Sequence, residues 1–422
     1  MKKIIALLLC VTFILSLAGC TQKSDDVTVG QLNADKIENV SINMNGDVFD
    51  DKFLTFIANS TEDNYMVSPL SFRYALGLLL AGAEGETKTE LLSALGVKDE
   101  AEWTAYCTKF NGFVKRFYQQ LDDEIKEFNT YKADFGLGAK APFRALRVAN
   151  SIWKREDIEK DFTSEYKEKI AANYGAEYCS FTPQNAVKKI NDWASRKTEK
   201  MIPKLLPDDY DTTNLAVVLM NALYFKDSWS EPFEKSATIS DDFNTRSGKK
   251  VKKDFMRKTE RLSYYGDENT QIVILPMDGG VSMAFVLGDR ENLGEKISKC
   301  EQRTVKLKIP KMDMETSFEN KELMAFLAQN GVSRAFDPNS ADFSAMIDHN
   351  IWVDDIIQKT KIKTDEEGVE AAAVTAIMMK DEAMVIDPNE PVEFNADRPF
   401  SFYIYTTCDD VTAILFAGEV VE

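Results

Sequence analysis

The assignment of the fold depends on how one stretch is interpreted, DEEGVEAAAVTAIMM at residues 365–379. Three acidic residues open the stretch, Gly368 interrupts it, and small residues follow. Alanine is the best helix former, and the run contains no turn signal. However, β-branched residues such as Val369 and Thr375 lie among the alanines and favour a strand. These residues alone leave a helix, a strand and an exposed loop open.

Length and composition indicate an ordinary globular protein. The chain has 422 residues, of which 44% are hydrophobic and 28% charged, enough for one large domain or two medium ones. The net charge of −18 argues against a nucleic-acid-binding protein, because phosphates would be repelled overall.

The N-terminus has the pattern of a secretory signal. Two lysines precede an apolar run that is too short to span a membrane, and the run ends in Leu17-Ala18-Gly19-Cys20. This ending resembles the cleavage box of bacterial lipoproteins, in which the cysteine becomes the lipidated first residue; an ordinary secretory signal with a chance cysteine is the alternative. We therefore predict a signal peptide over 1–19, lipidation of Cys20, and an exported protein anchored by lipid to a bacterial envelope and facing outward. Loss of the two lysines with the signal would change the net charge from −18 to −20.

Residues able to form a catalytic or metal centre are scarce. The only histidine is His349, in a polar context typical of a surface loop, so a histidine-dependent triad or a histidine-rich metal site has little support. No C-x-x-C pair is present, and we expect the four scattered cysteines to be free rather than to form a disulfide framework: Cys107, Cys179, Cys300 and Cys408. A carboxylate-pair enzyme stays open, because 69 acidic residues offer many pairs. No cofactor is predicted.

The order of patterns along the chain indicates an α+β fold. A polar segment over 20–46 is predicted to be a flexible tether, and 47–422 to be one domain. Helical patterns come first, including SPLSFRYALGLLLAGA at 68–83 and GETKTELLSALG, where Thr87 and Glu90 have the spacing of a capping box. Strand patterns follow, with β-branched or alternating apolar residues: 216–225, 271–277, 281–288, 303–312, 398–407 and 412–421.

Several segments, taken in order, resemble the serpin family of serine-protease inhibitors, which act by a conformational change. The most specific is LMNALYFKDSWSEPF at 219–233, with Asn221, Phe225, Lys226, Trp229 and Phe233 in place. The others are SPLSFRYALGLLLAGAEGETKTEL (68–91), VANSIWKR (148–155), INDWASRKTEKMI (190–202), LKIPKM (307–312), NGVSRAFDPNSADFSAM (330–346), RPFSFYIY (398–405) and LFAGEVV (415–421). The resemblance runs from about Val48 to the C-terminus. It implies helices packed around a large central β-sheet and smaller sheets, with an exposed reactive-centre loop.

The first stretch resembles the hinge of that loop, and its alternation agrees. The positions equivalent to a hinge are Glu366, Glu367, Gly368, Val369, Glu370, Ala371, Ala372 and Ala373. Every second residue from Val369 to Met379 is uncharged, while the intervening set contains the only charge, Glu370. A half-buried strand needs this segregation. The resemblance implies that the segment is a loop in the active protein and a central strand after cleavage, and the alternation is compatible with such a strand.

The resemblance implies a suicide-substrate inhibitor with no catalytic residue of its own. A protease trapped as an acyl-enzyme would be distorted when the loop, about 366–386, enters the sheet. The residues predicted to control opening of the sheet are Ser68, Ser71, Asn221, Trp229 and Gln358. Gln358 departs from the family, which usually has a histidine ten residues before the hinge glycine. Glutamine can still hydrogen-bond there but removes any pH-sensitive step.

The position of the reactive bond is less well defined. Counting from the hinge gives Glu382-Ala383, which would suit a glutamate-preferring protease. Counting back from the following strand gives a bond nearer Ile386, so Met384-Val385 is the second candidate and would suit chymotrypsin- or elastase-like enzymes. A non-inhibitory serpin that acts as a binding or carrier module, and an inhibitor of cysteine proteases, remain as alternatives. We expect a monomer.

Overall fold

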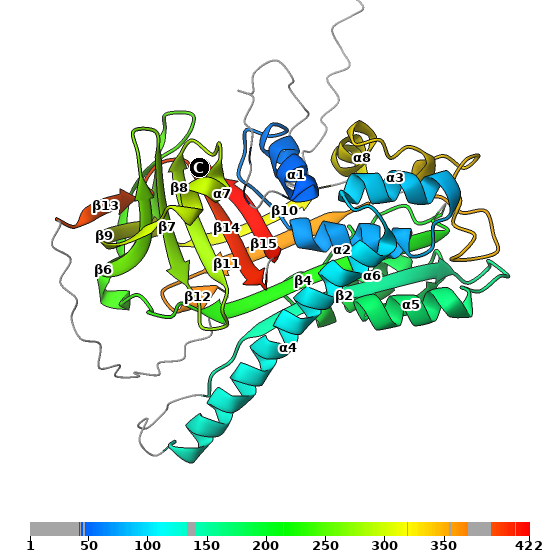
Figure 1. The fold of residues 1–422 in the computed structure, drawn as a ribbon, viewed down its shortest axis with the longest axis horizontal. Helices are drawn as coiled ribbons and strands as arrows, with labels where there is room; N and C mark the ends of the chain where they lie inside the picture. Colours follow the sequence, from blue (N-terminus) through cyan, green and yellow to red (C-terminus); the bar gives the residue numbers. More distant parts are fainter. Residues whose placement is uncertain are drawn as a thin grey trace, which may run out of the picture.

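The computed structural model describes residues 47–132, 141–213, 215–318, 320–353, 356–369, 390–409 and 411–422, together with Ile42 and Met44. Most helices lie before residue 200 and most strands after residue 216 (Figure 1), and most strand pairs are antiparallel, so the predicted α+β class is confirmed. None of the described helices is long and apolar enough to span a membrane.

The helices begin where the sequence offers caps. The Asp47 side chain accepts from the backbone N–H groups of Phe49 and Asp50, and the Ser68 hydroxyl accepts from the N–H of Ser71, with Pro69 in the first turn. The α-helices are α1 (Val48–Ala58), α2 (Pro69–Leu80), α3 (Gly85–Leu95), α4 (Glu100–Thr130), α5 (Ser164–Tyr174), α6 (Ala186–Lys197), α7 (Leu293–Ser298) and α8 (Asn320–Gln329).

The predicted capping box at α3 is wrong. The helix begins at Gly85 after Glu84, which makes no side-chain cap. Thr87 instead accepts a hydrogen bond from the N–H of Asp342 (3.0 Å), and Glu90 accepts from the N–H groups of Ser333 and Arg334. Both side chains bind a distant segment because tertiary packing places that segment against the helix.

The strands form two sheets. Their bounds are β1 (Tyr65–Val67), β2 (Ala145–Arg155), β3 (Glu177–Phe181), β4 (Val217–Ser228), β5 (Ile239–Asn244), β6 (Lys250–Gly266), β7 (Thr270–Pro276), β8 (Ser282–Gly288), β9 (Glu301–Pro310), β10 (Met312–Phe318), β11 (Gln358–Thr364), β12 (Gly368–Val369), β13 (Val392–Asn395), β14 (Phe400–Cys408) and β15 (Val411–Val420). One sheet has the order β10-β11-β12-β4-β2-β3. The other runs β1-β15-β14-β8-β7-β6-β9-β13, with β5 on β6.

Strand β4 is covered on both faces, which explains its continuous apolar run. Leu223 and Phe225 belong to the main core together with residues of α2, whereas Met220 and Ala222 belong to a second cluster with Trp193 of α6. Alternate side chains of a strand point to opposite faces, so a strand between two layers must be apolar on both. The six-stranded sheet is therefore sandwiched between helices, with β12 inside it.

The cysteines that the structure describes are free. Cys107 is buried, and Cys179 and Cys300 are partly buried, as the scattered spacing predicted. Burial raises the pKa of Cys107 to about 12 and that of Cys300 to about 11, so both thiols stay protonated and inert at neutral pH.

Candidate functional site

The hinge begins as a short strand wedged between two longer ones. Val369 pairs with Thr364 of β11 on one side and with Asp227 of β4 on the other, and Gly368 pairs with Ser228. Both β12 ladders are antiparallel. The side chain of Val369 is only 2% exposed, so the first position of the uncharged alternate set faces the core, as predicted.

Gly368 allows this close approach. A Cβ atom at that position would lie 2.2 Å from the carbonyl oxygen of Asp227 and 2.7 Å from the Cα of Ser228. Any other side chain would therefore push β12 away from β4.

A buried acidic residue holds the segment that directly precedes β12. Glu366 is 4% exposed, and its Oε1 accepts from the hydroxyl of Thr238 (2.6 Å) and lies 2.7 Å from the Nζ of Lys311. Burial acts to raise the pKa of Glu366, but the hydrogen bonds from Lys311 and Thr238 outweigh it and lower the pKa. The carboxylate is therefore charged at neutral pH and holds the chain in front of β12. The neighbouring Glu367 pairs with exposed Lys235 at 3.0 Å.

Trp229 binds the same entry segment. Its indole Nε1 donates to the carbonyl of Asp365 (2.9 Å), and its backbone N–H donates to the carbonyl of Glu367 (3.0 Å). The ring meets that of Phe233 edge-on. Trp229 thus lies at the hinge end of β4, apart from the other four residues of the predicted opening region.

The other four residues of the predicted opening region come together near the first residues of β4 and β11: Ser68, Ser71, Asn221 and Gln358. Gln358, 5% exposed, accepts from the N–H of Ser68 and donates to its carbonyl, both at 3.0 Å. The Ser71 hydroxyl donates to Asn221 Oδ1, and the Asn221 amide donates to Asn150 of β2. The hydrogen bonds between Gln358 and Ser68 match the prediction. The oxygen and the nitrogen of the Gln358 amide are both hydrogen-bonded, although glutamine stands in place of a histidine.

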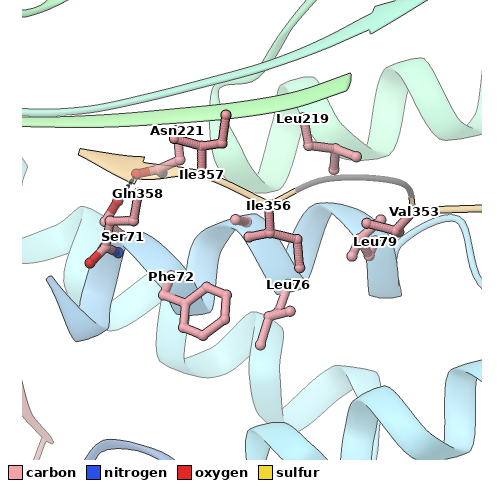
Figure 2. Close-up of a pocket in the computed structure, with 11 residues that line it drawn as sticks. Ser71, Phe72, Leu76, Leu79, Leu219, Asn221, Val353, Ile356, Ile357 and Gln358 are labelled. Atoms are coloured by element: carbon pink, nitrogen blue, oxygen red, sulfur yellow. Dashed lines mark hydrogen bonds between the residues drawn. The ribbon is translucent and has the colours of Figure 1, made fainter. Parts of the chain in front are cut away.

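A cavity of about 30 Å³ adjoins this polar cluster, between α2, β4 and the segment before β11. Figure 2 shows Leu76 and Leu79 of α2, Leu219 of β4 and Ile356 around it, with Ser71, Asn221 and Gln358 at one end. Interiors are normally packed without such space, so side chains are not closely packed at this place between β4 and the segment before β11.

Asp227 is a buried acid that sequence reasoning missed. It is 2% exposed and lies on β4 opposite Val369. Its Oδ2 accepts from the N–H of Gly279 and its Oδ1 from the N–H of Ser228, both at 2.9 Å. Burial raises its pKa to about 7, although the Gly279 hydrogen bond and the charge of Arg144 act in the opposite direction. An acid in the apolar run of β4 was the only signal that could have found it.

The remaining predicted positions lie elsewhere. His349 is exposed, which agrees with a surface loop. In the part of the chain that the structure describes, no group of three His, Cys, Asp or Glu side chains could hold a metal ion. The other predicted positions fall outside the described residues: Cys20, Glu370, Ala371, Ala372, Ala373, Glu382, Ala383, Met384 and Val385.

Comparison with known proteins gives one family. A family model described as Serpin (serine protease inhibitor) matches residues 49–422. Leukocyte elastase inhibitor of Equus caballus is 31% identical over 385 residues, covering 84% of this chain and 92% of that protein. Iripin-2 of Ixodes ricinus is 29% identical over 389 residues, covering 87% of this chain and 90% of that protein. The native structure of the thermophilic serpin tengpin is similar with a TM-score of 0.67 and 26% identity, covering 86% of this chain and 89% of tengpin.

Proposed function

Because the chain belongs to the serpin family, whose members are protease inhibitors rather than catalysts, we propose that it is a suicide-substrate inhibitor of extracellular serine proteases. The protease would cut the loop, form an acyl-enzyme, and be trapped when the segment of about 366–386 extends β12 through the six-stranded sheet. The observation that carries this proposal is β12, which is already paired on both sides.

The two observed registers agree on where an inserted loop would lie. Extended from Val369, the ladder with β4 puts Thr375 opposite Asn221, and the ladder with β11 puts Thr375 opposite Gln358. Insertion in this register would therefore end its first half at the polar cluster beside the cavity.

The same registers place the only charged residue between Val369 and Met379 in a favourable position. Glu370 would lie opposite Lys226 of β4 and Lys363 of β11, on the face away from Val369. Opposite charges directly across a ladder stabilise it by roughly 0.2–1 kcal/mol. Lys363 is exposed and Lys226 partly buried, so the pairing would cost little desolvation.

The driving force comes from backbone pairing and burial. About ten inserted residues would each gain ladder hydrogen bonds worth roughly 0.5–1.5 kcal/mol, and the uncharged side chains would be buried against Phe225, Leu223 and Ile362. This gain would be available only after cleavage frees the loop to enter.

The decisive experiment uses a denaturing gel. The purified domain from Asp47 onward would be incubated with elastase, chymotrypsin, trypsin and a glutamyl endopeptidase. A covalent band at the summed mass supports trapping, and the mass of the released C-terminal peptide distinguishes Glu382-Ala383 from Met384-Val385. Complete cleavage between 379 and 386 by every protease, with no covalent band, would instead favour a non-inhibitory serpin.

We also infer that the protein is a bacterial lipoprotein, exported and anchored through Cys20. The support is the sequence LAGC at the end of the apolar run and the polar segment 20–46 before the matched domain. Metabolic labelling with a palmitate analogue tests this: the native protein is expected to be labelled and to fractionate with membranes. The variant Cys20→Ala should lose both properties, and labelling that survives the substitution would contradict the anchor.

A further inference from the structure

The charge of this acidic protein is unevenly distributed. Residues 246–261 and 301–311, which include most of the neighbouring strands β6 and β9, contain twelve Lys or Arg against three Asp or Glu. The whole chain has a net charge of −18. These two strands are therefore far more basic than the chain as a whole, although the paired strands β5 and β13 contribute Asp241, Asp242 and Glu393. Figure 1 shows β6, β9 and β13 together at one end of the molecule.

Strand alternation brings three of these cations to one exposed face. Arg257 and Arg261 of β6 and Lys306 of β9 are exposed, whereas Leu262 and Val305, the chain neighbours of Arg261 and Lys306, are buried. We call Arg257, Arg261 and Lys306 the basic face. Arg257 and Arg261 are four residues apart in a strand, or about 13 Å.

Internal ion pairing does not account for these side chains. Lys306 is 3.9 Å from Glu393, and among the described residues neither Arg257 nor Arg261 has a carboxylate within 4 Å. Arg257 also lies directly opposite Lys308, a like-charge pair that costs stability in a sheet, although Asp241 partly neutralises Lys308 at 2.7 Å. Several of the twelve cations do have partners in the folded protein: Arg257 Nε donates to the carbonyl of Ala237 (2.9 Å), and Lys258 and Lys311 pair with Glu260 and Glu366. The side chains of Arg257 and Arg261 nevertheless stay exposed, and neither is neutralised by a carboxylate among the described residues.

The basic face adjoins the point where the reactive loop returns to the fold. Strand β13 pairs in parallel with β9, with Glu393 opposite Lys306, and Arg303 Nη2 donates to the carbonyl of Glu390 (3.5 Å). From Glu382 to Glu390 the chain spans at most about 28 Å. A protease domain of roughly 230 residues has a radius of gyration of about 17 Å, and a sphere with that radius of gyration is about 44 Å across, so the body of the protease extends past this distance.

We propose that the basic face is an auxiliary contact surface for the target protease, and that it selects proteases whose surface around the active site is acidic. The proposal rests on the proposed function as an inhibitor. The rest of the chain repels an acidic partner, so a basic patch beside the loop orients the encounter and raises the association rate. Specificity would then depend on this surface as well as on the residue before the cut.

The experiment measures the second-order rate of loop cleavage as salt increases from about 0.05 to about 0.5 M NaCl, over which the Debye length falls from above 10 Å toward 3–5 Å. Two serine proteases with the same primary specificity are compared, one with an acidic and one with a basic surface. The double variant Arg257→Gln/Arg261→Gln is expected to lose about three- to tenfold in rate with the acidic protease at low salt, and to flatten the salt dependence.

The matched control is Lys52→Gln/Lys115→Gln, which removes two exposed cations from α1 and α4. It should keep the native rate, and thermal unfolding should confirm that both variants fold. The proposal would be overturned if both double variants lost cleavage rate equally, or if neither did. It would also be overturned if Arg257→Gln/Arg261→Gln weakened binding to an anionic polymer without lowering the rate of loop cleavage. Cleavage is measurable even where no covalent complex forms, so failure of trapping and failure of the basic face are separate results.

Discussion

At the scale of single residues, Asp227 makes the folded state sensitive to pH. Its pKa is raised from 3.8 to about 7, so the native state holds a proton that the unfolded chain releases. The contribution to stability is fully present below pH 4 and is lost as the pH rises through 7, by at most about 4 kcal/mol. Ionised Asp227 therefore destabilises the native sheet at neutral pH, next to the wedge.

We predict that Asp227→Asn removes this dependence. The amide can still accept a backbone hydrogen bond but has no charge to bury, so the stability of the variant relative to the native protein should be greater at pH 8 than at pH 5, where only part of the contribution has been lost. Urea unfolding at the two pH values measures the difference. Asp209→Asn, at an exposed position, is the control, and an unchanged pH difference in Asp227→Asn would show that the carboxylate is not the source.

Gln358 is the second residue with a direct test. Gln358→Ala would leave the buried N–H of Ser68 without its acceptor, at a cost of roughly 1–3 kcal/mol in the free energy of unfolding, whereas the carbonyl of Ser68 would still accept from the N–H of Phe72. Gln302→Ala removes an exposed glutamine and should cost much less. Gln358→His should add a pH dependence of loop insertion near pH 6–7 to any that arises from Asp227. Identical pH profiles would mean that this position does not control opening.

At the scale of elements, the pairing of β12 predicts which face of the inserted loop tolerates a charged side chain. In the register of Val369, Ala373 would point inward between Leu223 and Thr360, whereas Ala372 would point outward. Ala373→Glu should convert the inhibitor into a substrate, because an unpaired carboxylate would have to enter the core. Ala372→Glu is the matched control and should still trap the protease. Trapping by both variants would refute this register.

The elements also show the limits of sequence patterns. The helix starts at Asp47 and Ser68 follow from local capping, and the face of Val369 follows from alternation. Thr87 and Glu90 had the right spacing for a capping box but bind a segment about 250 residues away. Asp227 and the Lys311–Glu366 pair also depend on strands that are distant in sequence. Patterns within one element predict its own ends and faces, whereas contacts between elements need the fold.

At the scale of the whole molecule, the proposed mechanism predicts that the native state is not the most stable arrangement of the chain, because β12 is only two residues long and its pairing with β4 and β11 could be extended. Cleavage of the loop should raise the thermal unfolding midpoint markedly, because about ten further residues would join the sheet. Calorimetry before and after limited proteolysis measures this shift, and the Ala373→Glu variant should show little of it. An unchanged midpoint after cleavage of the native protein would argue against insertion.

Strand β12 lies between β4 and β11, so only one strand can continue it between these two neighbours. Under the proposed mechanism each molecule would therefore act only once, unlike an enzyme that turns over. At the proposed lipid anchor, a population of such molecules would neutralise no more protease molecules than there are copies, and protection would then end abruptly. The depth of protection would be set by how many copies are displayed and how fast spent ones are replaced.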